Sequence, residues 1–273
     1  MADFSAQDVK RLRDSTGVGM MDAKKALTEN DGDFDAAIKW LLENGLSKAA
    51  ARSDRENTEG AVALGTAGRA ASLVQLKSET DFVAKSPDFT KLVQDAADLV
   101  AAEGEAAIGQ LQARLDELKI SLKENMDWGR VVRFEPADGN VMDTYLHVQN
   151  DRGVNGVLVE LAGGSPELAH EVALHIAFAK PTVLSRDEIP AAEVEEQREL
   201  LLNMTKAEGK PEQAWPKIVE GRLTGWFARL GEPEKGKPGG AMLDQPWTSD
   251  EKQTVTQALG DATVVRFAQV LIG

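Results

Sequence analysis

Three histidines, His147, His170 and His175, are the side chains of this sequence best suited to acid–base or metal chemistry. His170 and His175 lie five residues apart in a segment with helical periodicity, whereas two imidazoles that share one metal ion on a helix occupy positions i and i+4. The sequence has no cysteine, which excludes a thiol nucleophile and a thiolate metal site. It also lacks the Gly-x-Ser-x-Gly turn of many hydrolases. We therefore expect no metal site, no cofactor and no enzymatic activity.

Two glycine-rich stretches resemble phosphate-binding loops but depart from them. Gly231–Pro238 has the glycine spacing and the lysine of a Walker A loop, yet Pro238 replaces the Ser or Thr that would bind Mg²⁺. The stretch also follows a predicted helix, whereas a phosphate loop follows a strand. Gly17-Val18-Gly19 lacks the third glycine of a dinucleotide-binding fingerprint and has no strand before it. Both stretches are therefore interpreted as turns.

The elements that would position any functional side chain begin with three predicted helices. Ser5, Asp22 and Asp33 each precede a segment with apolar residues at helical spacing and are typical N-cap residues. Gly45 is typical of a helix end, so we expect the third helix to stop there. This unit of about 45 residues is near the lower limit for a domain that folds alone. A polar stretch at 53–60 is interpreted as a linker.

A unit of two strands and one helix occurs twice in the sequence. In each copy two apolar strand segments flank a polar turn, and a Ser-Pro pair then opens a helix. The strands are Ala61–Leu64 and Ala71–Leu76 in the first copy and Thr144–Val148 and Val157–Leu161 in the second, and the helices open at Ser86 and Ser165. This internal repeat predicts a pseudo-symmetric core of the α+β class, a pair of hairpin-plus-helix units.

The first copy carries six residues more than the second between its last strand and its helix, because the offset between aligned positions falls from 85 to 79. The extra residues lie within 77–85 and include Phe82 and Val83. Two adjacent apolar residues are unusual in a loop that is exposed to solvent. They either pack into this chain's own core, which composition favours, or are offered to a partner.

The remaining segments predict mainly helices. Leucines at helical spacing from Leu111 to Leu122 predict an amphipathic helix, and a strand-like stretch follows at 131–134. Further along, Ala191–Ala207 and Pro211–Leu230 predict a helical hairpin, 231–240 a loop, and Thr254–Ile272 a short helix and a closing strand. The expected domains are 1–54, 55–140 and 141–273, the last with the hairpin inserted at about 187–230.

The composition is that of a soluble globular protein, with 42% hydrophobic and 28% charged residues among 273. The chain is longer than a usual domain of about 100–150 residues, which favours more than one module. A formal net charge of −14 opposes binding to nucleic acid, because phosphates attract basic surfaces. No secretory signal opens the sequence, and no run of about 18 apolar residues occurs. We expect a cytoplasmic protein that binds neither nucleic acid nor a membrane directly.

Two segments carry a specific resemblance to a known family. Residues 12–27, LRDSTGVGMMDAKKAL, and residues 79–85, ETDFVAK, closely resemble the two signature segments of bacterial elongation factor Ts. Shorter similarities follow in the family's order over nearly the whole chain, namely Lys123–Asn125, Ala173–Ile176, Ala179–Pro181, Val219–Arg222 and Leu243–Pro246. The chain departs from the family's usual pattern at Lys77 and Ser78, where Asn and often Cys precede the second signature.

By this resemblance the chain would be a guanine nucleotide exchange factor for the GTPase elongation factor Tu. The first module would be a three-helix domain similar to ubiquitin-associated (UBA) domains, and the repeat would be a two-part core. The helical hairpin would be a coiled-coil protrusion. The resemblance leaves open a homodimer, or a two-to-two complex with the GTPase, formed through that hairpin.

The resemblance also implies which residues contact the GTPase. They are Thr80, Asp81, Phe82 and Val83 in the extra loop, Arg13, Met20 and Met21 in the first module, and His175 in the second copy. The loop would enter the nucleotide-binding domain and disturb its Mg²⁺ and phosphate contacts. Without the resemblance, Met20 and Met21 are as readily core residues, and His175 on an apolar helix is more typical of a buried histidine.

Two other functions remain open. A UBA-like interaction scaffold would bind a partner without changing its nucleotide exchange, and a nucleotide-release assay separates the two functions. An enzyme would need a pocket of convergent polar groups, which no constellation in the sequence suggests.

Overall fold

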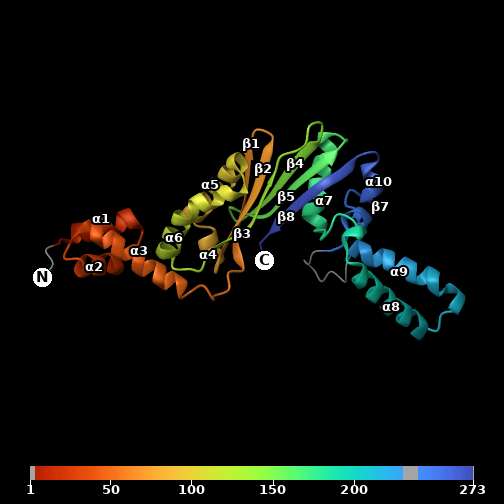
Figure 1. The fold of residues 1–273 in the computed structure, drawn as a ribbon, viewed down its shortest axis with the longest axis horizontal. Coiled ribbons are helices and arrows are strands. Elements are labelled where there is room, and N and C mark those ends of the chain that lie inside the picture. The colour runs from red at the N-terminus through yellow and green to blue at the C-terminus, as the bar shows by residue number, and fades with distance from the viewer. Residues whose placement is uncertain (1–3, 230–238, 273) are drawn as a thin grey trace. The chain divides into compact units, whose positions relative to one another are not determined.

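The computed structural model describes residues 4–229 and 239–272 (Figure 1). It mixes helices with antiparallel sheets, so the predicted α+β class is confirmed. The chain forms two compact units. The first comprises the chain up to Glu135, Leu146–Gly156 and the stretch from Val270, and the second comprises Pro136–Tyr145 and Val157–Gln269. The three-domain division expected from the sequence stays a prediction.

Three helices form a module at the start of the first unit. They are α1 (Ala6–Thr16), α2 (Met20–Glu29) and α3 (Phe34–Ala50). Ser5 caps α1 in a capping box with Asp8, and Asp33 caps α3 by accepting a hydrogen bond from the Ala36 amide. These two predicted caps are confirmed. The inner faces of the three helices share one small hydrophobic cluster centred on buried residues such as Leu12.

The predicted cap of the second helix is wrong. Helix α2 begins at Met20, directly after Gly19, so Asp22 lies inside its first turn. The carboxylate of Asp22 accepts a hydrogen bond from Lys123 at 2.8 Å, and this bond lowers the pKa of Asp22 below its ordinary value. An acidic side chain in a first turn is still favourable, because the amides there lack helical partners.

The predicted end of the third helix is also wrong, because α3 continues through Gly45 to Ala50. A Cβ atom at Gly45 would lie 2.6 Å from Cγ1 of Ile120, which is closer than real side chains approach. Ile120 packs against the hydrophobic cluster of the three-helix module. The glycine therefore serves the close approach of two helices and does not end one.

The first copy of the repeat forms an antiparallel sheet in the order β1-β2-β3. Its elements are β1 (Glu59–Ala67), β2 (Ala70–Ser78), α5 (Pro87–Glu103), the 3-10 helix η1 (Glu105–Leu111), α6 (Gln112–Leu122) and β3 (Asp127–Phe134). The predicted hairpin, helices and strand are confirmed, although β1 and β2 are longer than expected. Residues such as Phe89 of α5 and Leu115 of α6 are buried in one core with this sheet.

Gly65 in β1 allows α5 to lie directly on the sheet. A Cβ atom there would come within 2.3 Å of the carbonyl group of Ala97. The Ser72 hydroxyl of β2 donates a hydrogen bond to the same carbonyl at 2.6 Å. Sheet and helix are thus joined by a polar contact inside an otherwise apolar layer.

The second copy forms the sheet β4-β5-β8. Its elements are β4 (Val141–Gln149), β5 (Arg152–Ala162), α7 (Pro166–Ala179) and β8 (Thr263–Leu271). Asn150 and Asp151 both adopt left-handed φ angles, which suit a two-residue hairpin turn. Between β5 and α7 the chain turns on Gly163 and Gly164, both at positive φ, and Ser165 caps the helix as predicted. The duplicated unit of hairpin and helix is therefore confirmed.

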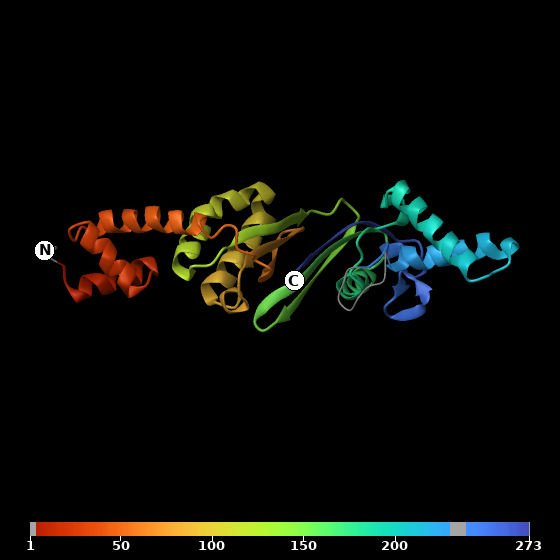
Figure 2. The same cartoon turned by 90° about the horizontal axis from the view of Figure 1, so that it is seen from below.

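Helices α8 (Ala191–Ala207) and α9 (Trp215–Arg229) lie side by side as a helical hairpin (Figure 1, Figure 2). The predicted limits of α8 are confirmed. The second helix was expected from Pro211, but a 3-10 turn, η3 (Glu212–Ala214), precedes α9. The predicted Leu230 end of this helix and most of the loop expected at 231–240 lie outside the described residues.

The remaining elements precede or follow the helical hairpin in the sequence. They are the 3-10 helices η2 (Arg186–Glu188) and η4 (Met242–Asp244), the strands β6 (Pro246–Trp247) and β7 (Asp250–Thr254), and α10 (Val255–Leu259). The predicted short helix and closing strand are confirmed, and Thr254 caps α10. Across residues 4–229 and 239–272, no helix has the length and apolar character needed to cross a lipid bilayer.

Candidate functional site

The extra residues of the first copy form a one-turn helix, α4 (Asp81–Ala84), between β2 and α5. Thr80 is its N-cap, and the threonine hydroxyl accepts a hydrogen bond from the Val83 amide at 3.3 Å. A threonine cap followed by an acidic first-turn residue is a favourable start for a helix. The segment expected as a loop is therefore a defined turn of helix.

Helix α4 has an inward and an outward side. Ala84 is buried, and Val83 packs against the core cluster of the β1-β2-β3 sheet. Phe82 is 83% exposed. The interpretation as core residues, which composition favoured, is therefore wrong for Phe82 and holds in part for Val83. An exposed phenylalanine forgoes about 2–3 kcal/mol of burial free energy that a partner surface can recover.

Asp81 forms an ion pair with Lys85, one helical turn further on. Its carboxylate accepts a hydrogen bond from the lysine Nζ at 2.5 Å. This hydrogen bond lowers the pKa of Asp81 below its ordinary value. The turn therefore carries an ionised carboxylate at the position before Phe82.

The implied contact residues of the three-helix module also lie on its surface. Arg13 is exposed in the last turn of α1, and Met20 and Met21, at the start of α2, are 45% and 74% exposed. The core alternative for the two methionines is therefore wrong. The residues flank the turn 17–19, where Gly17 ends α1 in a left-handed conformation, as expected of a turn. Flexible, polarizable methionine side chains suit a contact surface.

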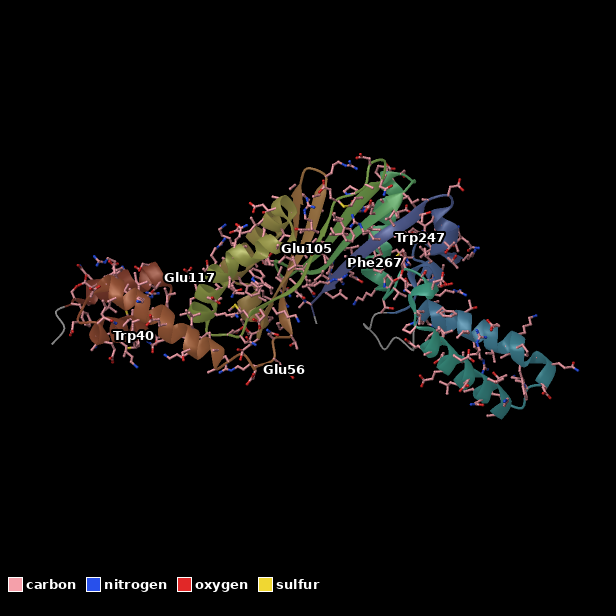
Figure 3. All side chains as sticks on the ribbon, in the orientation of Figure 1. Trp40, Glu56, Glu105, Glu117, Trp247 and Phe267 are labelled. Carbon is pink, nitrogen blue, oxygen red and sulfur yellow. The ribbon has the colours of Figure 1, made fainter. Side chains whose placement is uncertain are left out.

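His175 is fully buried in the second copy. Its Nε2 lies 3.0 Å from Oε1 of Gln245, and its Nδ1 lies 3.3 Å from the Thr248 hydroxyl. The ring stacks on Trp247, which Figure 3 labels, with 5.1 Å between the ring centroids. Burial lowers the pKa of His175 below its ordinary value. This is the satisfied core histidine that its apolar helix suggested, and a direct partner contact stays a prediction that would require residues 245–248 to move.

The other histidine of this helix faces a different environment. His170 is exposed, and its Nδ1 lies 2.7 Å from a carboxylate oxygen of Asp143. The two rings of α7 therefore do not converge. Among the residues that the structure describes, no three His, Asp or Glu side chains gather closely enough to hold a metal ion.

Sequence reasoning missed two exposed apolar residues on α7. Leu174 and Phe178 are 39% and 80% exposed and lie one helical turn apart. The signal was present, because the inward stripe of α7 is already complete with residues such as Val172 and Ile176. A second apolar stripe outside a complete one is typical of a contact surface.

The structure thus gathers the implied contact residues into separate groups. Thr80 to Val83 share one helical turn, and Arg13, Met20 and Met21 flank another turn of the same unit. His175 belongs to the second unit and does not reach the surface.

Comparison with known proteins assigns a family to this arrangement. The family model described as elongation factor TS matches residues 79–273. An elongation factor Ts of Clavibacter michiganensis is 40% identical over the full length of both chains. Those of Cutibacterium acnes, covering 99% of each chain, and of Mycobacterium ulcerans, covering 100% of this chain and 99% of the relative, are 42% and 40% identical. The chain therefore belongs to the elongation factor Ts family of translation elongation factors.

Proposed function

We propose that this chain docks on elongation factor Tu carrying GDP and acts as its guanine nucleotide exchange factor. The turn from Thr80 to Val83 enters the nucleotide-binding domain and disturbs the Mg²⁺ and phosphate site. The observation that carries the proposal is the exposed Phe82 ring on a capped helical turn, within the second family signature. Displacing Mg²⁺ weakens nucleotide binding because the ion neutralises phosphate charge.

Magnitudes show that Phe82 needs supporting contacts. A nucleotide held at nanomolar affinity is bound by about 12 kcal/mol, whereas burying one phenylalanine contributes about 2–3 kcal/mol. We propose that Arg13, Met20 and Met21 bind the GTPase, while the ring of Phe82 inserts between two helices of the GTPase and separates them. We also propose that His175, a buried residue of α7 that packs against Gln245 and Trp247, supports a contact of the second unit with the GTPase.

The finer assignments of the fold belong to the same proposal. The three-helix module is UBA-like, and the α8–α9 hairpin is the coiled-coil protrusion through which a homodimer or a two-to-two complex would form. The net charge of −14 supports a factor that acts on a protein in the cytoplasm and does not grip nucleic acid or a membrane.

The test is release of a fluorescent GDP from elongation factor Tu by substoichiometric amounts of the chain. The wild-type chain should accelerate release, and Phe82→Ala should slow it by much more than it weakens the complex. Val148→Ala is the matched control, because it truncates an exposed apolar side chain elsewhere in the first unit. Equal release rates for Phe82→Ala and the wild type would remove the ring from the mechanism.

The scaffold alternative predicts a different response to nucleotide. If the chain weakens nucleotide binding, nucleotide must weaken binding of the chain by the same factor. GDP should therefore displace the chain from elongation factor Tu in size-exclusion chromatography. A complex whose stability does not depend on GDP would favour the UBA-like scaffold with no effect on exchange.

A further inference from the structure

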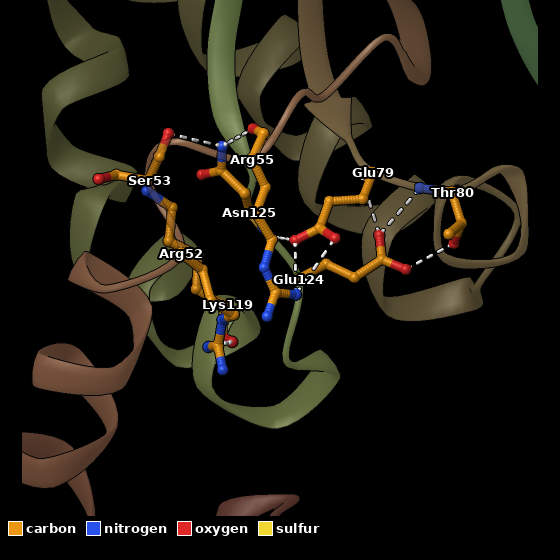
Figure 4. Close-up of polar contacts among 8 residues, drawn as sticks. All are labelled: Arg52, Ser53, Arg55, Glu79, Thr80, Lys119, Glu124 and Asn125. Carbon is orange, nitrogen blue, oxygen red and sulfur yellow. Dashed lines mark hydrogen bonds and ion pairs between the residues drawn. The ribbon is translucent and has the colours of Figure 1, made fainter.

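The segment that follows α6 lies beside the segment that precedes α4 (Figure 4). Lys123 ends α6 with a left-handed φ of 62°. The next two residues, Glu124 and Asn125, then make polar contacts with residues more than forty positions earlier in the sequence. None of these contacts belongs to the β1-β2-β3 ladder, so they require a separate explanation.

Glu124 holds the start of α4 through three hydrogen bonds. Its Oε2 accepts from the amides of Glu79 and Thr80, both at 3.1 Å, and its Oε1 accepts from the Thr80 hydroxyl at 2.5 Å. A hydroxyl has one hydrogen, so donation to the carboxylate leaves the oxygen lone pairs free to accept. The Thr80 oxygen uses them to accept from the Val83 amide, which is the capping bond of α4. The carboxylate therefore determines the direction of the cap.

Glu79, in the segment before α4, in turn accepts a hydrogen bond from the segment after α6. Its carboxylate accepts a hydrogen bond from the Asn125 amide at 2.6 Å and pairs with Arg55 at 3.4 Å. The side chain of Asn125 is buried, and its Nδ2 donates to the carbonyls of Ser53 and Arg55 at 3.2 and 2.7 Å. The two segments are thus braced reciprocally, and the linker from the three-helix module is attached at the same point (Figure 4).

A helix of four residues cannot persist by itself, because nucleating one turn fixes several residues for a single hydrogen bond. Helix α4 therefore depends on tertiary support, and its outward side, with Phe82 exposed, provides none. We propose that Glu124 is a positioning residue for nucleotide exchange, which fixes the Thr80 cap and so holds Phe82 in the orientation that meets the GTPase. This inference rests on the proposed function above.

The first experiment uses the free chain and does not involve a partner. Amide hydrogen exchange, followed by NMR, should show protection of Thr80 and Val83 in the wild type. Glu124→Ala should reduce that protection by about tenfold or more, the loss expected when hydrogen bonds to a charged group are removed. Glu124→Gln keeps one acceptor oxygen and should lose less. Glu251→Ala, which truncates an exposed glutamate of β7, should change nothing at α4.

The second experiment is a double-mutant cycle on GDP release from elongation factor Tu. Glu124→Ala should lower the maximal release rate at saturating factor by about tenfold or more, on the same basis as the lost protection. The concentration of factor that gives half the maximal rate should change much less, because the other docking contacts stay intact. In a Phe82→Ala background, Glu124→Ala should have no further effect on the rate.

The outcomes separate the two proposals. If Phe82→Ala slows release and Glu124→Ala does not, or if α4 protection survives in Glu124→Ala, the positioning role is overturned. If the Phe82→Ala chain accelerates GDP release as much as the wild type, the proposed role of Phe82 fails, whereas the amide measurement still decides whether Glu124 holds the cap. If the wild-type chain itself does not accelerate release, the proposed function fails. Should Glu124→Ala fail to fold, Glu124→Gln decides both experiments by changes in the same direction.

Discussion

Gly45→Ala should destabilise α3 in the wild-type chain. The same change should stabilise α3 once Ile120, which is far away in the sequence but packs against Gly45, is truncated to alanine. Gly45 lies in the interior of α3, where alanine is normally favoured over glycine by about 1 kcal/mol. At this position, however, the new Cβ would lie 2.6–2.7 Å from three carbon atoms of Ile120. Two of those atoms branch directly from the Ile120 Cβ, so they cannot swing away as a flexible tip would.

The magnitude follows from these two opposing effects. Overpacking of this kind costs about 1–3 kcal/mol, which exceeds or cancels the propensity gain of about 1 kcal/mol. Gly45→Ala should therefore destabilise α3 by about 0–2 kcal/mol in the wild-type background. In an Ile120→Ala background the three clashing atoms are absent, and Gly45→Ala should stabilise α3 by about 1 kcal/mol. The difference, about 1–3 kcal/mol, is the coupling free energy between the two positions.

Hydrogen exchange of the α3 amides measures the local opening free energy that this prediction concerns. Gly221→Ala is the matched control, because this glycine lies inside α9 with nothing within 4 Å of a new Cβ. It should stabilise its own helix by about 1 kcal/mol in both backgrounds. If Gly45→Ala stabilises α3 equally with and without Ile120, the two helices do not pack as the structure shows.

Two further predictions concern the cores of the two units. Because burial lowers the pKa of His175, the unfolded chain binds a proton that the folded chain does not. The contribution of His175 to the free energy of unfolding should therefore have its full value above about pH 6.5 and decrease as the pH falls below that value. Urea denaturation at several pH values measures this slope, which His175→Gln should reduce. Gly65→Ala would bring a Cβ within 2.3 Å of the Ala97 carbonyl group. It should lower the free energy of unfolding by at least about 2 kcal/mol, and a stability equal to that of the wild type would contradict the close approach of α5 to the sheet.

The duplicated fold could be predicted because its signals are local. Ser-Pro pairs at helix starts, apolar strand segments and polar turns each act within a few residues, and the structure contains both copies, although only Ser165 caps its helix through its side chain. The errors arose where a tertiary contact overrides a local preference. Gly45 has the type of a helix end but accommodates Ile120, and Asp22 has the type of a cap but binds Lys123. The small sheet of β6 and β7 was missed because its strands are short and largely polar.

The sequence predicted where the candidate site lies in the chain, but not which of its side chains are exposed. The comparison of the two copies pointed to residues 77–85, yet no local pattern tells whether an apolar residue there is buried or exposed. Exposure of Phe82 depends on which side of α4 meets the core. The hydrogen bonds that hold this turn come from Glu124, 44 positions beyond Thr80, so no short segment contains their signal.

The turn on Gly163 and Gly164 shows what the architecture needs at this junction. The second copy passes from hairpin to helix through these two glycines and one capping serine, without an intervening helix. A strand of this duplicated unit can therefore connect to its helix without a segment like the one that carries Phe82. Under the proposed function, a chain whose first copy is closed as tightly as its second would keep this architecture and lose nucleotide exchange.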